Sequence, residues 1–250
     1  MVIEIEKELV AALKEARTSG DELLVKCCEL SGVKSECGSP AYAPDVDGDS
    51  EEARTQELDR MVNDTKVSIE RARLLRLYLA VKGHLWSQYL EGYNFHFGRN
   101  IPRDYVVARY WYTRAAEQGH SWAQNNLGVL YSDGLGVEAD QEKAVYWYMK
   151  SAEGGDDTAK GNLGEHLVEG TGAKRCYQKA ARLLKEYLKT QPFSAKHHRL
   201  LAECYEHGVG GRSGKRLAVF HYQEASDFGS DKARKALRRL TNGLISSVKL

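Results

Sequence analysis

Apolar side chains recur every three or four residues along most of the chain, which is the period of an amphipathic helix. The first apolar stripe predicts a helix near the start of the chain and consists of Val2, Ile5, Leu9, Leu13 and Ala16. Asp21 can begin a second short helix and Gly32 can end it, so we expect a helical hairpin within residues 1–33. Residues 34–55 have no period and carry prolines, glycines and a dense acidic run. They are predicted to form a flexible acidic loop.

A long helix is predicted next, over residues 56–82. Its apolar stripe includes Leu58, Met61, Val62, Thr65, Ile69, Ala72, Leu75 and Leu79. Such a stripe can pack against whatever follows, so we expect this helix to cap the rest of the fold at its N-terminal end.

From residue 84 onward the pattern repeats with a period of 36 residues, followed by one shift of 38. Gly128 maps back to Gly92 and forward to Gly164, and Trp147 maps back to Trp111. The sequence therefore predicts four repeats and a C-terminal helix within residues 83–240, then a tail at 241–250; the repeats are 84–119, 120–155, 156–190 and 191–230.

Each repeat contains two helical stripes around a glycine-rich joint, which is typical of an αα-hairpin. In the second repeat both stripes are expected to be core; they are Ala123, Leu127, Leu130 and Tyr131, and then Ala144, Trp147, Tyr148 and Ala152. The glycines that lie inside a predicted helix, such as Gly92 and Gly164, cost about 1 kcal/mol each relative to alanine. We expect them where the partner helix approaches closely.

The ends of the predicted helices have suitable residues. Asp104 and Asp140 stand where an N-cap would begin the second helix of a hairpin. Glycines stand where turns and helix C-termini need positive φ or close approach; they are Gly134 and Gly136 in the joint and Gly119, Gly155 and Gly229 after the second helix.

The stretch from Ala123 to Gly155 has the pattern A-x-x-x-L-G-x-x-Y-x-x-G-x-G-V followed by D-x-x-K-A-x-x-W-x-x-K-x-A-E-x-G. It resembles the SEL-like repeat family, a relative of the tetratricopeptide repeats. The third repeat has Leu183 in place of the tryptophan, and the fourth has Ala202 at the helix-internal glycine and His221 at the tryptophan. The resemblance covers about residues 84–240 and implies an all-α, right-handed superhelical solenoid of αα-hairpins with N-terminal capping helices.

Composition narrows the functional classes. The chain is 42% hydrophobic and 28% charged, as in ordinary soluble proteins, and 36 basic residues against 35 acidic ones leave a net charge of +1. No global field favours nucleic acid or anionic lipid, so neither a nucleic-acid nor a membrane partner is expected. The early acidic residues Glu4, Glu6 and Glu8 do not fit a signal peptide, which predicts a cytoplasmic protein.

The sequence offers little for catalysis, cofactors or metals. The Gly208–Arg216 stretch resembles a phosphate-binding loop, but Val209 and Arg216 stand where that motif needs Gly and Ser or Thr. The Asp45–Ser50 stretch likewise resembles a calcium-binding loop but does not match the pattern of ligand positions that such a loop requires. The five cysteines have no paired CxxC spacing and are expected to stay reduced; they are Cys27, Cys28, Cys37, Cys176 and Cys204. We expect no catalytic residue, cofactor or metal site.

A solenoid presents a concave groove formed by its first helices, with side chains that the packing stripe leaves free. The expected protein-binding residues are Trp86, Tyr89, Tyr93, Phe97, Trp122, Asn125, Asn126, Val129, Asp133, Glu165, Arg199 and Glu203. Tryptophan and tyrosine dominate interface energies, so the first two repeats are the preferred binding end. In the alternative, the helix ending near Lys82 covers Trp86 and Tyr93.

These observations predict a non-catalytic adaptor, with a monomer favoured, that binds a protein or peptide partner in its groove. The resemblance also leaves open a dedicated inhibitor of one cognate protein, such as a bacterial toxin or effector immunity protein. An enzyme is a further alternative, because some cysteine-rich relatives are credited with binding or hydrolysing cell-wall-derived antibiotics. Those relatives carry paired cysteines in each repeat, and no repeat here has such a pair.

Overall fold

The computed structural model describes residue 11 and residues 69–247 of the chain. The predicted hairpin at residues 1–33 (apart from residue 11), the acidic loop at 34–55 and the start of the long helix, residues 56–68, lie outside the described residues.

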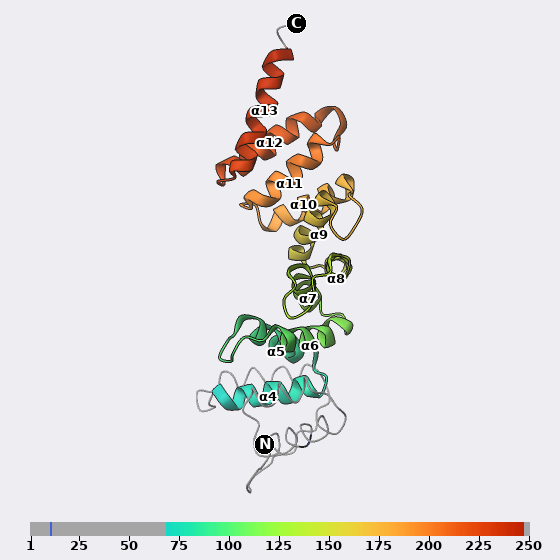
Figure 1. The fold of residues 1–250 in the computed structure, drawn as a ribbon, viewed down its shortest axis with the longest axis vertical. Helices are drawn as coiled ribbons and strands as arrows, with labels where there is room; N and C mark the ends of the chain where they lie inside the picture. Colours follow the sequence, from blue (N-terminus) through green and yellow to red (C-terminus); the bar gives the residue numbers. More distant parts are fainter. Residues whose placement is uncertain (1–10, 12–68, 248–250) are drawn as a thin grey trace. The chain divides into compact units, whose positions relative to one another are not determined.

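The described ranges contain helices and no strand (Figure 1). The helices are α4 (Ile69–Val81), α5 (Leu85–Phe97), α6 (Tyr105–Glu117), α7 (Ser121–Asp133), α8 (Gln141–Glu153), α9 (Asp157–Glu169), α10 (Tyr177–Thr190), α11 (Ala195–Glu206), α12 (Gly214–Asp227) and α13 (Asp231–Ser247), with a short 3-10 turn at Gly211–Ser213. α4 is the described part of the predicted long helix. α13 continues to Ser247, into the segment expected to be a tail.

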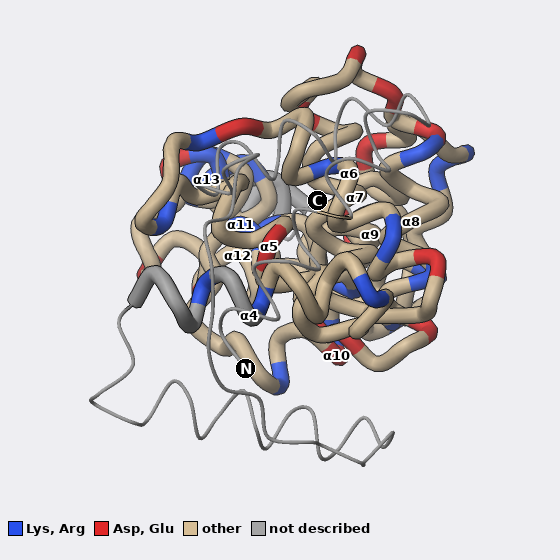
Figure 2. Tube along the Cα trace, turned by 90° about the horizontal axis from the view of Figure 1, so that it is seen from below, with Lys and Arg blue, Asp and Glu red and all other residues tan. Residues whose placement is uncertain are grey.

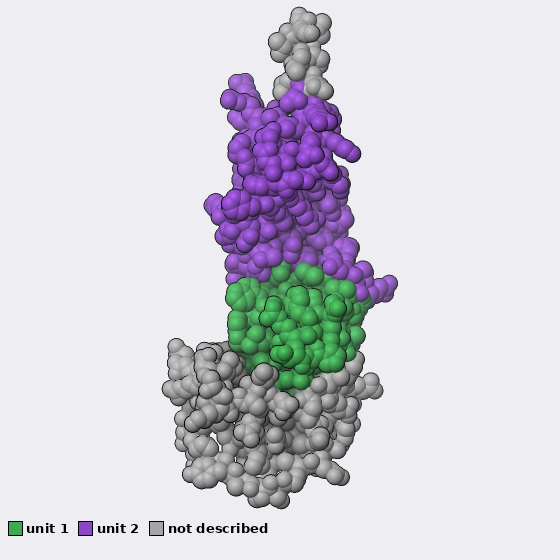
Figure 3. All heavy atoms as spheres, turned by 90° about the vertical axis from the view of Figure 1, so that its left-hand side faces the viewer, with its two compact units in different colours: residues 1–130, 135–137 green, residues 131–134, 138–250 purple. Residues whose placement is uncertain are grey.

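The described helices form two compact units, whose described residues after position 68 are 69–130 and 135–137 in the first and 131–134 and 138–247 in the second (Figure 3). In the first unit α5 packs against α4 and α6. In the second, each helix from α8 to α13 packs against the next. Packing between consecutive helices is the arrangement of an α-solenoid, as the sequence predicts.

Local signals placed the helix ends correctly. The Asp104 carboxylate accepts hydrogen bonds from the backbone N–H groups of Val106 and Val107, at 3.0 and 3.1 Å, and the Asp140 carboxylate accepts one from Lys143 N–H at 2.9 Å. In the glycine-rich joint that follows α7, Gly136 has a φ of +66°, and a Cβ on this residue would lie 2.5 Å from the Tyr105 carbonyl carbon. Glycine is therefore required at this position both for its backbone angle and for space.

Glycines inside the helices mark close helix contacts, as predicted. A Cβ on Gly92 of α5 would lie 2.5 Å from Tyr112 Cδ1 of α6. A Cβ on Gly164 of α9 would lie 2.8 Å from Leu184 Cγ of α10. In both pairs the second helix occupies the space that a side chain would need.

The expected core stripes of the second repeat are only partly buried. Ala144 and Tyr148 are buried, but Trp147, Ala152 and Tyr131 are half-buried. Trp147 is therefore less deeply buried than the predicted core stripe implies. The equivalent residue of the first repeat, Trp111, has no exposed surface. Its surroundings enclose the ring completely, whereas those of Trp147 do not.

Replacing Gly92 by alanine should destabilise the protein, although alanine is the better helix former by about 1 kcal/mol. The added methyl group would overlap the Tyr112 ring, and overpacking of this kind costs about 1–3 kcal/mol. Urea denaturation of G92A gives the change. In a Tyr112→Ala background the same substitution should lose its penalty, and an equal penalty in both backgrounds would contradict the steric explanation.

The two equivalent tryptophans should differ in their contribution to stability. Trp111→Ala should lower the free energy of unfolding by about 3–5 kcal/mol, as expected for removing a fully buried aromatic ring. Trp147→Ala should cost about 1–2 kcal/mol, because part of that ring is already in water. Chemical denaturation of both variants tests the difference, and equal losses would show that the burial of the two rings does not differ.

Candidate functional site

Five aromatic side chains gather on one face of the first unit. Trp86, Tyr89, Tyr93 and Phe97 follow one another along α5, and Trp122 joins them from α7. Ring centroids are 5.4 Å apart for Trp86 and Tyr89, 6.0 Å for Tyr89 and Tyr93, and 4.6 Å for Tyr93 and Phe97. The Trp122 ring lies 5.4 Å from that of Trp86 and 5.9 Å from that of Tyr89. We call these five residues the aromatic row.

The aromatic row is accessible to solvent. Phe97 is 52% exposed and Trp122 is 49% exposed, while the other three side chains are half-buried. Large apolar side chains exposed next to one another are uncommon on a surface that has no partner.

The helix before the repeats packs elsewhere on α5. Gln88 Nε2 donates a hydrogen bond to Ala80 O of α4 at 3.0 Å, and Arg76 Nε donates one to the Glu91 carboxylate at 2.7 Å. At about 100° per residue, Gln88 and Glu91 point away from the face that carries Trp86 and Tyr93. The described part of this helix therefore contacts α5 on a different face, and the rings of Trp86 and Tyr93 remain partly exposed. The alternative in which the helix covers these two rings stays a prediction, because residues 56–68 lie outside the described residues.

His120 is a member of this region that sequence reasoning missed. Its ring stacks on Tyr89 with centroids 4.6 Å apart and lies within 5.2 Å of Trp86. Its Nδ1 accepts a hydrogen bond from Ala123 N–H at 3.3 Å, and burial lowers the pKa of the imidazole. His84 lies 36 residues earlier and accepts a hydrogen bond from Ser87 N–H in the same way. The recurrence of histidine at this position of the repeat could therefore have identified His120 from the sequence.

Tyr112 supports the aromatic row from α6. Its hydroxyl lies 3.4 Å from His96 Nδ1 and accepts a hydrogen bond from Asn126 Nδ2 at 3.1 Å. Burial raises the pKa of this phenol, so it remains a neutral hydroxyl. The structure thus assigns Asn126 a contact with Tyr112 beside the aromatic row.

The other expected residues of α7 are less accessible. Asn125 is only 7% exposed, so the prediction that it lines an open surface is wrong. Its amide is much shorter than the Tyr89 phenol at the equivalent position and does not reach the surface. Val129 is half-buried, and Asp133 is exposed.

Three expected residues lie in the second unit and form ion pairs there. Glu165 pairs with Lys196, with the charged atoms 2.6 Å apart, and Arg199 pairs with Glu203 one turn along α11. These residues belong to a different unit from the aromatic row, and their part in one binding surface stays a prediction. Figure 2 shows both signs of charge interspersed along the described chain.

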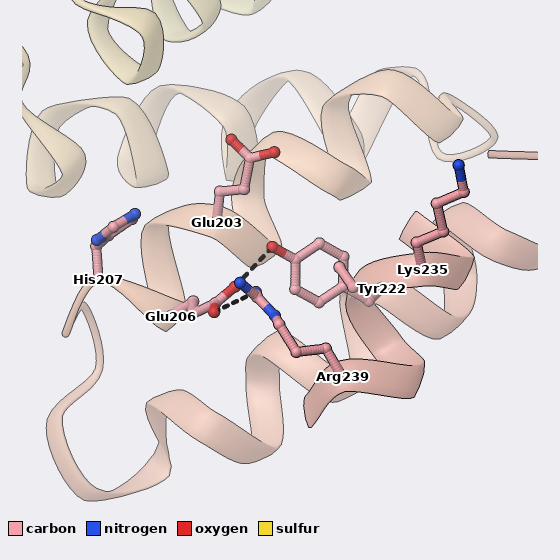
Figure 4. A pocket seen from close by; sticks show the side chains of 7 residues that line it. Glu203, Glu206, His207, Tyr222, Lys235 and Arg239 are labelled. Atoms are coloured by element: carbon pink, nitrogen blue, oxygen red, sulfur yellow. Dashed lines mark hydrogen bonds and ion pairs between the residues drawn. The ribbon is translucent and has the colours of Figure 1, made fainter. Parts of the chain in front are cut away.

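A pocket of about 480 Å³ lies between α11, α12 and α13 (Figure 4), and its lining is Glu203, Glu206, His207, Tyr222, Lys235, Ala236 and Arg239. The Tyr222 hydroxyl donates a hydrogen bond to Glu206 Oε2 at 2.9 Å, and Arg239 forms an ion pair with the same carboxylate. The Tyr222 phenol and the Arg239 guanidinium therefore both engage the Glu206 carboxylate.

The described cysteines and loops do not form a reactive site. Cys204 is buried, and this burial raises the pKa of its thiol to about 12, which disfavours the nucleophilic thiolate. Cys176 and Cys204 are both unbridged. Within the described ranges no cluster of His, Cys, Asp and Glu could hold a metal ion, and the glycine-rich stretch from Gly208 joins α11 to α12. No helix among the described residues is long and apolar enough to span a membrane.

Comparison with known proteins agrees with the repeat pattern. The model of the Sel1 repeat matches half of the chain, over residues 87–120, 123–156, 161–185 and 198–229. Comparison with curated protein sequences found no significant match.

Two solved structures show the same fold. A protective antigen of uropathogenic Escherichia coli that displays an SLR fold is 26% identical, with a TM-score of 0.61 over 75% of this chain and 40% of its own. This chain therefore spans less than half of the length of that antigen. A Sel1 repeat protein from Oxalobacter formigenes is 24% identical, with a TM-score of 0.57 over 75% of this chain and 74% of its own.

Two histidines of the second unit are held in neutral form, His197 buried and His221 half-buried. His197 packs on Tyr187 with centroids 4.1 Å apart, and burial lowers its pKa to about 4, assisted by Lys196. Burial also lowers the pKa of His221 to about 4, assisted by His198 and Lys185. The Nδ1 atoms of His198 and His221 are 2.9 Å apart, which requires one ring to donate and the other to accept.

Stability should therefore fall in mildly acidic solution. A histidine in the unfolded chain titrates near pH 6.5, whereas His197 and His221 in the native protein titrate near 4. Between these values the unfolded state binds more protons, so the free energy of unfolding decreases as pH falls from about 6.5 towards 4. Urea denaturation at several pH values should show a shallower decrease for His197→Gln/His221→Gln. His207→Gln, which changes an exposed histidine, serves as the control, and parallel curves for all three proteins would refute this origin.

Proposed function

This chain belongs to the Sel1 repeat family, and from that premise we propose that it is a non-catalytic scaffold whose aromatic row binds a protein or peptide partner. Proteins built from Sel1 repeats generally serve as protein-interaction scaffolds, and the fold is typically non-catalytic. The observation that carries the proposal is the contiguous set of five accessible aromatic side chains on α5 and α7.

The physical basis is the chemistry of aromatic side chains at interfaces. Tryptophan and tyrosine bury a large apolar area with few rotatable bonds and retain a polar group for a hydrogen bond. The rings of the aromatic row already contact one another, so little side-chain freedom remains to be lost when a partner binds. Asn126 and Val129 lie on α7 with Trp122 and would extend the contact.

The adaptor and the inhibitor hypotheses differ in the consequence of binding, not in the surface used. An adaptor leaves the activity of its partner intact, whereas a dedicated inhibitor suppresses it. An activity measurement on the identified partner therefore distinguishes them.

Affinity capture from a lysate of the source organism tests the proposal. Wild-type protein should retain a partner that a Phe97→Ala/Trp122→Ala variant loses, with at least a tenfold decrease in recovered amount, because truncating an aromatic hot-spot residue costs about 2 kcal/mol or more. The matched control is Tyr146→Ala/Phe220→Ala, since these side chains are 52% and 55% exposed but lie on α8 and α12.

The control variant should capture the partner as the wild type does. Equal capture by all three proteins would show that the aromatic row is not the binding surface. Thermal denaturation of each variant establishes that loss of capture does not reflect loss of folding.

A further inference from the structure

The aromatic row has the features of a surface for an extended, proline-containing segment. Neighbouring rings along α5 are inclined to one another by 44°, 46° and 46°, and Trp122 is inclined by 56° to Trp86. Inclined rings present a series of edges and faces, not the single flat face on which a sugar or a base would stack. Proline-rich segments in the polyproline II conformation bind to aromatic-lined surfaces of this kind.

The length of the aromatic row also fits such a segment. From Trp86 to Phe97 the α5 backbone rises by about 16 Å at 1.5 Å per residue. A polyproline II segment rises about 3.1 Å per residue, so about five ligand residues would span the row.

The hydrogen-bonding groups of the aromatic row are of the right type. A polyproline II backbone makes no internal hydrogen bonds, and prolines have no N–H, so its exposed carbonyl groups need external donors. The indole N–H groups of Trp86 and Trp122 donate to no partner among the described residues, and the Tyr93 hydroxyl makes no hydrogen bond there. These groups can therefore donate hydrogen bonds to the carbonyl groups of a ligand without breaking an existing hydrogen bond.

The charge at one end of the aromatic row indicates which type of residue should lie beside the prolines in the ligand. Arg99 lies 4.8 Å from the centroid of the Tyr93 ring, and Arg103 lies 5.7 Å from that of Tyr105. Both arginines are exposed, and neither forms an ion pair with a described acid. Residues 69–130 carry eight Lys or Arg against four Asp or Glu. Of those acids Glu91 is buried against Arg76 and Asp104 accepts the backbone N–H groups at the start of α6, and the exposed Arg99 and Arg103 place positive charge at the Phe97 end.

We propose that the aromatic row binds a proline-containing peptide segment in the polyproline II conformation, with an acidic residue of that segment against Arg99 and Arg103. This inference rests on the proposed function and specifies the chemistry of the partner. A polyproline II helix can dock in either direction, and the arginines at the Phe97 end select one of them.

Selection from a random library of 12-residue peptides tests the inference without knowledge of the natural partner. The full chain is the target, and the Phe97→Ala/Trp122→Ala variant is used for counter-selection. The enriched peptides should contain at least two prolines and at least one Asp or Glu to one side of them. Enrichment of peptides without proline, or the absence of any peptide that distinguishes the two proteins, would overturn the inference.

Synthetic variants of the best peptide then separate its two parts. Replacing the prolines by alanine should weaken binding at least tenfold in isothermal titration calorimetry, and replacing the acidic residue by lysine should weaken it several-fold. With the Arg99→Gln protein the proline effect should persist while the preference for the acid decreases. Tyr146→Ala/Phe220→Ala should bind as the wild type does. If the alanine or the lysine peptide binds as well as the original, the corresponding part of the assignment is wrong.

Two further outcomes distinguish this inference from the proposed function. If a native partner depends on Phe97 and Trp122 but no proline-containing peptide does, the function stands and the polyproline II assignment fails. Binding of an oligosaccharide probe such as chitotetraose, lost in the same aromatic variant, would assign the aromatic row to sugars and overturn both.

Discussion

The packing of the Tyr112 ring against Gly92 is the contact on which the organisation of the first unit depends. Because Gly92 has no side chain, α6 approaches α5 closely enough for Tyr112 to occupy the space of a Cβ. The Tyr112 hydroxyl then reaches His96 on α5 and Asn126 on α7. One aromatic side chain thus connects three helices from two consecutive repeats, and it fixes the positions of the helices that carry the aromatic row.

This contact leaves α5 with three distinct faces. One face meets α4 through Gln88 and Glu91, and a second meets α6 through Gly92. The third carries the aromatic row and has Phe97 more than half exposed. Contacts with α4 and α6 already hold the helix on two sides. The aromatic side chains of the third face therefore bury only part of their surface within the protein. Their apolar area is available to a partner.

The sequence predicted the repeat period, the Asp104 and Asp140 caps and the close contact at Gly92, because each depends on local geometry that one residue type satisfies. It did not predict how deeply each position is buried. Trp111 and Trp147 occupy equivalent places, yet only Trp111 is fully enclosed. Likewise Asn125 is buried where Tyr89 is half-exposed. Periodicity defines the direction of a side chain, whereas its depth depends on the size of neighbours that lie far away in sequence.

Equivalent positions of the repeats also carry different types of side chain, aromatic in the first unit and charged in the second, and this difference affects the free energy of binding a partner. In the second unit Glu165 and Lys196, and Arg199 and Glu203, already pair with each other. A partner that used these charges would have to replace existing ion pairs, each worth about 0–1 kcal/mol at a surface, and would lose hydration as well. The aromatic row has no such pairs to break. Association there would remove apolar surface from water without replacing an existing ion pair, which is why the proposed binding surface lies in the first unit.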